Sequence, residues 1–313
     1  MGESGQVAVY GEALVDDFLS EQVVGGAPFN VARNLAAFGT SPLMITRTGL
    51  DEHGGLIRSE FRRFGLNGDG VQLDARAPTG RVMVKRTPQG HRFIVLPEQA
   101  YDHIEARPAL AALEQHPPAT IYFGTLAQRS TQSRNTLLRL LQASDATRFL
   151  DLNLREGQFS ARTIDESLQL ADIVKVNEEE LDHLFKCYAP GLPAGAAARP
   201  EEAAAAEACR ALQRRFALQG LLVTLGARGA VYFDGEGQIH GAHDGVAPAH
   251  FIDTVGAGDA FAAVFLFGRL HGWPLPLTLA RAHAFAAAIC GIAGAVPPDL
   301  EFYAPWLAGW RSR

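Results

Sequence analysis

The string Asp253 to Phe261 carries the residue types that a phosphate-handling site needs, two glycines and then an acid at the start of an apolar helical run. Gly256 and Gly258 let the backbone turn tightly into a helix, whose unpaired N–H groups can hold an anion. Asp259 follows directly and could accept a proton from a hydroxyl that attacks a phosphate. The string by itself also fits a capped helix start with an acid in its first turn.

A second string, Gly25 to Gly39, joins a flexible Gly-Gly pair to a run with apolar residues at helical spacing. Asn30 lies at the expected helix start, where its neutral amide could both donate to and accept from a sugar hydroxyl. The same residue would also serve as a helix cap. This string therefore indicates a binding site only in combination with other residues.

Small or polar residues follow five predicted strands at the points where those strands end. Because ligands of open parallel sheets bind beyond the carboxyl ends of the strands, this pattern predicts a polar crevice along one edge. The residues, strand by strand, are Gly11, Glu12 and Asp16, then Gly124 and Thr125, then Asp151, Asn153 and Arg155, then Asn177 and Glu180, and finally Gly226 and Gly229.

Several other catalytic motifs are absent from the sequence. Phe261 stands where a dinucleotide fingerprint would have its third glycine, and no G-x-x-x-x-G-K-[ST], G-x-S-x-G or H-E-x-x-H string occurs. These absences exclude a P-loop enzyme and give no support to a serine hydrolase or a zinc protease.

The elements that must position these residues form an α/β pattern, with β-branched or aromatic runs alternating with helical periodicity. This pattern predicts a mainly parallel sheet flanked by helices. The predicted strands are Gln6–Tyr10, Leu43–Arg47, Thr120–Phe123, Arg148–Leu152, Asp172–Val176, Leu221–Leu225 and Ala230–Phe233. The predicted helices are Phe29–Phe38, Leu56–Phe64, Thr131–Ala143, Glu178–Phe185, Pro200–Phe216, Asp259–His271, Leu277–Ile292 and a last turn or two near Trp306.

One region departs from this alternation. Gly80–Arg86 and Arg92–Leu96 read as two strands of a hairpin with no helix between them. With Asp17–Val24 they could form a small sheet that stands off the main domain as a lid. The alternative is an antiparallel extension of the main sheet.

Composition limits the class of protein. The 313 residues have 47% hydrophobic content and a net charge of −6, which is enough chain for a full core and too acidic for a nucleic-acid-binding surface. Three widely spaced cysteines, no secretory pattern at the start and no apolar stretch of about 20 residues favour a soluble cytoplasmic protein without a membrane segment.

With these strings in place, the chain resembles the ribokinase-like (PfkB) carbohydrate kinases along essentially its whole length. Both signature regions of that family, Gly25 to Gly39 and Asp253 to Asp259, occur in the family's order. The resemblance implies one three-layer αβα domain over residues 1–313, with a small β lid formed by residues about 12–25 and 79–104. It also implies ATP-dependent phosphorylation of a sugar hydroxyl.

The resemblance implies roles for the motif residues. Asp259 matches the catalytic base of the family, and Gly256, Ala257 and Gly258 match the anion hole for the charge on the transferred phosphoryl group. The positions that match sugar-hydroxyl contacts are Asp16, Gly26 and Asn30. Arg155 would contact sugar or phosphate, or would only pin its own loop.

The resemblance also implies a nucleotide side with bound ions. Asn177 and Glu180 match an N-x-x-E element that organises Mg²⁺ through waters. Asp253 and the carbonyl of Val255 match ligands of a monovalent cation such as K⁺. The residues that match nucleotide contacts are Asn177, Thr224, Gly226, Gly229 and His283, of which His283 could instead be a packed residue on an Ala-rich helix.

Within the family, the strings look most like the fructokinase branch, so fructose is the expected sugar. Ribokinases place a carboxylate against their sugar close to where this chain has Leu126-Ala127-Gln128. The absence of a carboxylate from these three residues favours fructose over ribose. A sugar acid or phosphosugar stays open, because further arginines besides Arg155 could lie near the cleft and bind an anion. These arginines are Arg33, Arg47, Arg81 and Arg92.

The alternatives are a 2-keto-3-deoxygluconate kinase, a nucleoside or ribose kinase of the same family, and a non-catalytic sugar sensor on the same fold. The expected partners are the sugar and ATP, with no nucleic acid and no membrane. A homodimer formed through the lid is a further expectation.

Overall fold

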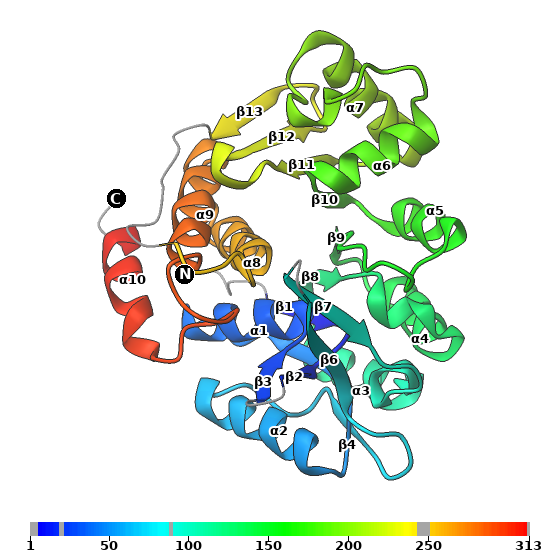
Figure 1. Cartoon of the computed structure of the whole chain (residues 1–313), viewed down its shortest axis with the longest axis vertical. Helices are drawn as coiled ribbons and strands as arrows, with labels where there is room; N and C mark the ends of the chain where they lie inside the picture. Colours follow the sequence, from blue (N-terminus) through cyan, green and yellow to red (C-terminus); the bar gives the residue numbers. More distant parts are fainter. Residues whose placement is uncertain (1–5, 19–21, 88–89, 243–250, 312–313) are drawn as a thin grey trace.

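The computed structural model describes residues 6–18, 22–87, 90–242 and 251–311. Its main sheet has the strand order β13-β12-β11-β10-β9-β8-β1-β4-β5 and crosses the molecule from top to bottom in Figure 1. Strands β11 to β5 in this order run parallel, and β12 pairs antiparallel with both β11 and β13. The strands are β1 (Gln6–Tyr10), β4 (Leu43–Gly49), β5 (Val71–Asp74), β8 (Pro118–Phe123), β9 (Thr147–Asp151), β10 (Ile173–Asn177), β11 (Gly220–Thr224), β12 (Ala230–Asp234) and β13 (Ile239–Ala242).

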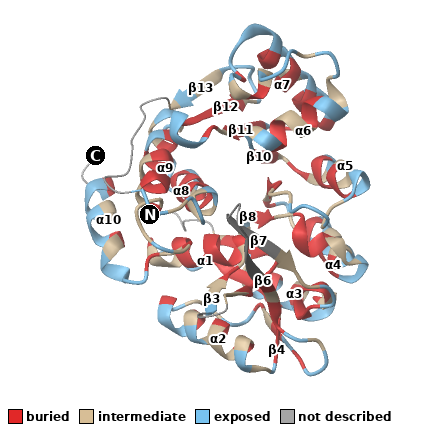
Figure 2. Cartoon of the chain, viewed as in Figure 1, coloured by how far each residue is buried: buried red, intermediate tan, exposed pale blue. Residues whose placement is uncertain are grey.

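Helices cover both faces of this sheet, which gives the three layers that the sequence predicts. One face carries α3 (Ala106–Gln115), α4 (Thr131–Gln142), α5 (Ala161–Leu170), α6 (Glu178–Tyr188) and α7 (Ala203–Phe216). The other face carries α1 (Ala27–Ala37), α2 (Glu52–Phe64), α8 (Ala257–Leu270), α9 (Leu275–Ile289) and α10 (Ala304–Arg311). Figure 2 shows the buried residues gathered along the sheet and on the helix sides that meet it.

The two hydrophobic cores explain why the parallel strands read as continuous apolar runs. In β10, Val174 and Val176 belong to the core under α3–α7, while Ile173 belongs to the core under α1, α8 and α9. Helix α8 is apolar all around because it is buried from Ala260 to Gly268. None of the helices in the described ranges has the length and apolarity needed to cross a membrane.

A second sheet is separate from the main one and has the order β3-β2-β6-β7. Its strands are β2 (Leu14–Asp17), β3 (Gln22–Gly25), β6 (Gly80–Thr87) and β7 (Gly90–Val95). Strands β6 and β7 form the predicted hairpin, and β2 pairs with both β3 and β6. The alternative of an antiparallel extension of the main sheet is therefore wrong.

The predicted elements are present, and several further ones were not predicted. Each predicted strand lies within two residues of an observed one, whereas α7 begins at Ala203 instead of at Pro200. The unpredicted elements are β5, β13, α3, α5, the short 3₁₀ helices and most of β2, which shares only Asp17 with the predicted stretch Asp17–Val24.

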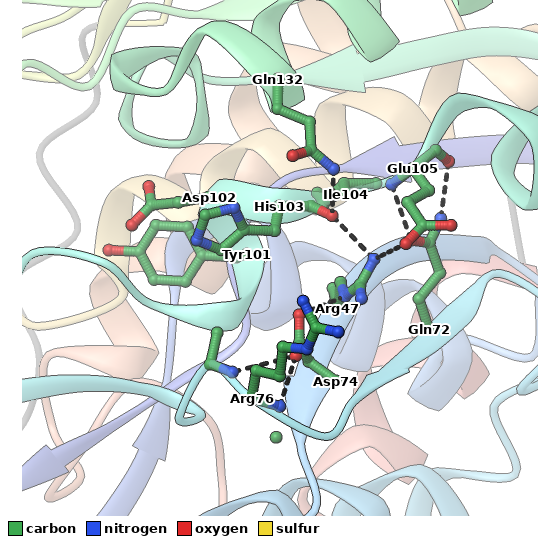
Figure 3. Close-up of polar contacts among 12 residues, drawn as sticks. Arg47, Gln72, Asp74, Arg76, Tyr101, Asp102, His103, Ile104, Glu105 and Gln132 are labelled. Atoms are coloured by element: carbon green, nitrogen blue, oxygen red, sulfur yellow. Dashed lines mark hydrogen bonds and ion pairs between the residues drawn. The ribbon is translucent and has the colours of Figure 1, made fainter.

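Arg47 of β4 ties the edge of the main sheet to the segment that leads into α3 (Figure 3). Its guanidinium pairs with Asp74 at 2.8 Å and with Glu105 at 2.6 Å, and it also donates to the carbonyl of His103. Gln72 bonds both the N–H and the carbonyl of Glu105. Arg47 thus has a structural role, and the expectation that it could bind a ligand in the cleft is wrong.

Candidate active site

The start of helix α8 is shaped by Gly256. Its φ of 77° is left-handed, and a Cβ at this position would lie 2.4 Å from both the Cα and the carbonyl oxygen of Ala295. Only glycine fits here. The N–H of Ala257 donates to the carbonyl of Thr254 at 3.2 Å, so an anion at this helix start would share that donor with Thr254.

Asp259 lies in the first turn of α8 and is only partly exposed. Its Oδ2 accepts a hydrogen bond of 2.7 Å from Nδ2 of Asn30, which comes from α1. Burial and the nearby carboxylate of Asp151 raise the pKa of Asp259 to about 6, against the lowering effects of Asn30, Lys175 and Arg155. The side chain is therefore mostly ionised at pH 7 and able to accept a proton.

Lys175 is a buried cation that the sequence analysis missed. Its Nζ lies 3.0 and 2.8 Å from the two carboxylate oxygens of Asp151, which also accepts a 3.0 Å hydrogen bond from Tyr122. A Cβ added to Gly258 would lie 3.6 Å from the same Nζ, which places the ammonium beside the start of α8. Burial lowers the pKa of Lys175, but Asp151, Glu180 and Asp259 outweigh it and raise the pKa, so the ammonium stays charged.

A pocket of about 720 Å³ opens beyond the ends of β9, β10 and β11. It brings together nearly all of the predicted nucleotide and anion residues, with Lys175 and Asp151 at the sheet. The predicted residues that line it are Asn177, Glu180, Thr224, Gly226, Gly229, Ala257, Gly258, Asp259 and His283. Its volume is in the range of small-molecule sites.

His283 of α9 lines this pocket with an apolar wall that includes Phe251, Ala286 and Ala287. It is buried, and among the described residues no group hydrogen-bonds its Nε2. Burial lowers the pKa of His283, so the ring is neutral at pH 7. A neutral imidazole with an unsatisfied nitrogen, next to apolar surface, suits a flat heteroaromatic base.

Asn177 and Glu180 form a reciprocal cap at the start of α6. Oδ1 of Asn177 accepts from the N–H of Glu180, and Oε2 of Glu180 accepts from the N–H of Asn177, both at 2.9 Å. Oε1 of Glu180 accepts from the N–H of Leu154. Because backbone donors engage both Glu180 oxygens, this pair suits a metal held through waters better than one bound directly. In the described ranges, no three His, Cys, Asp or Glu side chains are placed to hold a metal ion directly.

The predicted monovalent-cation residues lie at the turn before α8. Oδ1 of Asp253 accepts a 2.8 Å hydrogen bond from the N–H of Val255, and the Val255 side chain is exposed. This turn leads directly into the residues that form the start of α8.

The predicted sugar side lies on β2 and at the start of α1. A Cβ on Gly25 would lie 2.6 Å from Oδ2 of Asp16, so this glycine gives the carboxylate its room. Gly26 caps α1 with φ 101°, and a Cβ there would lie 2.7 Å from the carbonyl of Glu12. Burial raises the pKa of Asp16 to about 6.

Arg155 lies exposed in the loop after β9. Its charge lowers the pKa of Asp16, Asp259 and Glu12, so it lies near all three carboxylates. Glu12 belongs to the predicted crevice, although the sequence assigned no role to it. It is buried, and burial raises its pKa to about 7.

Two other arginines expected near the cleft are ion-paired with carboxylates of the protein. Arg33 pairs with Glu60 at 2.9 Å, and Arg81 pairs with Asp17 at 3.0 Å. The side chain of Arg92 lies outside the described residues. Together with the structural role of Arg47, these pairs leave Arg155 as the arginine best placed to meet a ligand.

Comparisons with known proteins bear on this geometry. A family model described as pfkB family carbohydrate kinase matches residues 9–301. A fructokinase of Klebsiella pneumoniae is 30% identical over 307 residues, which cover 92% of this chain and 92% of that protein. The structure of fructokinase from Xylella fastidiosa with bound ATP superposes with a TM-score of 0.81 at 22% identity, over 98% of this chain and 99% of that one. The 2-dehydro-3-deoxygluconokinase of Thermotoga maritima superposes with a TM-score of 0.78 at 18% identity, over 97% and 100%.

Proposed function

Since the chain belongs to the pfkB family of carbohydrate kinases, we propose that it transfers the γ-phosphate of ATP to a hydroxyl of a free sugar, and that this sugar is fructose. The placement of Asp259 carries the proposal. This carboxylate lines the 720 Å³ pocket and at the same time bonds Asn30, which comes from the sugar side. It therefore lies where a sugar hydroxyl and a terminal phosphate would meet.

In the proposed reaction Asp259 is the general base. It takes the proton of the sugar hydroxyl, whose oxygen forms a bond to the γ-phosphorus, while the bond from that phosphorus to the bridging oxygen of ADP breaks. Asp16, Gly26 and Asn30 hold the sugar. The second sheet, within residues about 12–25 and 79–104, acts as a lid that keeps water away from the phosphate.

The charge that develops on the transferred group meets two sources of positive potential. One is the start of α8, with the amides of Gly256, Ala257 and Gly258. The other is the ammonium of Lys175, which Asp151 orients from the sheet side. Asp151 preorganises Lys175, whereas the N–H of Ala257 would be shared between the phosphoryl group and the carbonyl of Thr254.

ATP would occupy the pocket, with its base against His283 and its phosphates toward Lys175. Asn177 and Glu180 would hold Mg²⁺ through waters, and bound Mg²⁺ neutralises phosphate charge. Asp253 and the Val255 carbonyl would hold a monovalent cation such as K⁺. The nucleotide contacts from the other side of the pocket come from Thr224, Gly226 and Gly229.

The choice of fructose rests on the fructokinase of Klebsiella pneumoniae, which is similar over 92% of this chain. The fold alone does not select the sugar, because a fructokinase and a 2-dehydro-3-deoxygluconokinase superpose almost equally well. Arg155 favours the second candidate, a kinase for a keto-deoxy sugar acid, because a guanidinium can bind the acid's carboxylate in a bidentate manner.

An ADP-release assay with Mg·ATP tests the proposal directly. The panel is fructose, ribose, 2-keto-3-deoxygluconate, fructose phosphates and adenosine. Fructose is expected to give the highest kcat/KM. A higher value for the sugar acid would transfer the assignment to the second candidate, and no release with any acceptor would favour a non-catalytic sensor.

Replacing Asp16 by alanine is expected to raise the KM for the sugar about 100-fold and to leave the KM for ATP within about twofold, because a lost hydrogen bond to a charged group costs about 1.5–3 kcal/mol. Steady-state kinetics with each substrate varied in turn measures both constants. Equal increases in the two KM values would remove Asp16 from the sugar pocket.

The pH profile of kcat/KM for the sugar is expected to fall on the acid side with a midpoint near pH 6. The pKa values of Asp259 and Asp16 are both raised to about 6, so protonation below that pH removes the base and a sugar acceptor together. In Asp16→Asn this decrease on the acid side of the profile, the acid limb, should persist with a shallower slope, because Asp259 alone then titrates. A midpoint near 4 in the wild type would contradict the effect of burial.

A further inference from the structure

We infer that Arg33 is a positioning residue that turns the amide of Asn30 toward Asp259 and links this contact to strand β3 of the second sheet. The inference rests on the proposed role of Asp259 as the base. It assigns to Arg33 an indirect part in phosphoryl transfer, with no contact to substrate.

The amide of Asn30 has only one orientation compatible with its neighbours. Nη2 of Arg33 lies 2.6 Å from one end of the amide, and Oδ2 of Asp259 lies 2.7 Å from the other. A guanidinium can only donate, so the end that it meets must be Oδ1. The NH₂ group then faces Asp259, where a donor favours the ionised carboxylate.

Arg33 is itself held rigidly. Nη1 bonds Glu60 of α2 at 2.9 Å, and the guanidinium lies 5.0 Å from the ring of Phe29 and 5.9 Å from that of Phe64. Only 4% of the residue is exposed. Burying a guanidinium in a helix that packs on the core is costly, and an apolar residue could fill the same face of α1. The hydrogen bond from the guanidinium of Arg33 to Asn30 accounts for an arginine at this position.

The same nitrogen also reaches the second sheet. Nη2 of Arg33 donates to the carbonyl of Val24 in β3 at 2.8 Å, in addition to its bond with Asn30. Val24 is next to Gly25 and pairs with β2, which carries Asp16. A shift of β3 against α1 would therefore disturb the donor that orients Asn30, so the position of the proposed lid and the state of the base are coupled.

The other charged groups around Asp259 do not depend on Arg33. Asp151 and Lys175 come from the sheet, Arg155 from the loop after β9, and Glu12 from the segment after β1. Replacing Arg33 leaves these four in place. Replacing Arg33 also removes a cation that lies one amide away from Asp259 and that lowers the pKa of Asp16. A rise in the pKa of Asp259 therefore reports the orientation of Asn30 only if the same replacement causes no such rise when Asn30 is already alanine.

The test compares Arg33→Met, Asn30→Ala and the double variant, each with fructose and ATP. Arg33→Met is expected to lower kcat about tenfold and to shift the acid limb upward by about one pH unit, with the KM for ATP unchanged. The double variant should be no slower than Asn30→Ala, because Arg33 acts through Asn30. Multiplying effects in the double variant would overturn the inference.

Arg129→Met is the matched control. Arg129 pairs with Asp102 at 2.7 Å and is also largely buried, but where Arg33 bonds Asn30, Arg129 bonds Gln158 and the carbonyl of Leu96. Its loss should lower the melting temperature without moving the acid limb. If both variants destabilise and neither moves the limb, Arg33 has only a structural role.

Carbon NMR of the Asp259 carboxyl group gives a readout that needs no turnover. The pKa of Asp259 should rise in Arg33→Met. It should rise by less in Glu60→Gln, which keeps Arg33. The second variant can be measured even if Arg33→Met does not fold. An unchanged pKa in a folded variant overturns the positioning role. Absence of ADP release by the wild type would instead refute the kinase assignment, and the NMR result would still decide how Asn30 is oriented.

Discussion

Replacing Asp259 by asparagine is expected to lower kcat by about 10³-fold and to leave the melting temperature unchanged or slightly higher. Asparagine keeps the shape of the side chain and an oxygen that can accept from Asn30, but it cannot take a proton from a sugar hydroxyl. The KM for ATP should change little, because the helix start and the pocket remain. An ADP-release assay and thermal unfolding at pH 7 measure the two effects.

The stability part of this prediction follows from the sign of the pKa shift. The pKa of Asp259 is raised to about 6 in the folded chain, above the ordinary value of 3.8. The folded state therefore holds the proton more tightly than the unfolded chain, and stability falls as the pH rises from about 4 to about 6. At pH 7 the full destabilisation that comes from burying the ionised carboxylate is present, and replacement by asparagine removes it.

Glu52→Gln is the control for a helix-dipole effect, since Glu52 lies exposed in the first turn of α2. It should leave kcat unchanged. Substantial phosphorylation by Asp259→Asn would remove Asp259 from the role of base, and a large loss of stability would mean that its negative charge has a structural purpose.

The parts of the fold that the sequence could predict have local signals. The apolar run of β10 and the uniformly apolar α8 both follow from periodicity and length. Helix α5 was missed because two of its core positions are Thr163 and Ser167, whose hydroxyls bond Ser160, Gln128 and the helix backbone. Polar residues that are satisfied by tertiary partners do not read as an apolar stripe. The short β13 has no long run to reveal it.

The same limit applies to the candidate site. The glycine strings are local, because a tight turn and a helix start leave a contiguous signature. Lys175 has no such signature, since in sequence it is one polar residue within a strand, and only its pairing with Asp151 places it at the site. Arg33 was one of several arginines that could lie near the cleft and bind an anion, and nothing in the sequence indicated that its partner is Glu60, on another helix. Contacts between distant segments decided both cases.

Lys175→Met separates stability from chemistry when it is combined with a change at Asp151. The single variant is expected to lower the free energy of unfolding by about 3–5 kcal/mol, because it leaves a buried carboxylate without its cation. It should also lower kcat by about 100-fold or more, since the proposed phosphate-facing charge is gone. Chemical unfolding and ADP release measure the two losses.

Adding Asp151→Asn to Lys175→Met removes both charges and keeps an acceptor for the hydroxyl of Tyr122. Stability should then recover to near the wild-type value, because replacing both members of a buried ion pair by neutral groups of similar size is often neutral. The kcat should stay low, because no ammonium lies beside Gly258. If the double variant regained wild-type turnover, Lys175 would only be compensating Asp151. If turnover stays low in a stable protein, the ammonium acts on the phosphoryl group, and this accounts for a lysine in the otherwise apolar run of β10.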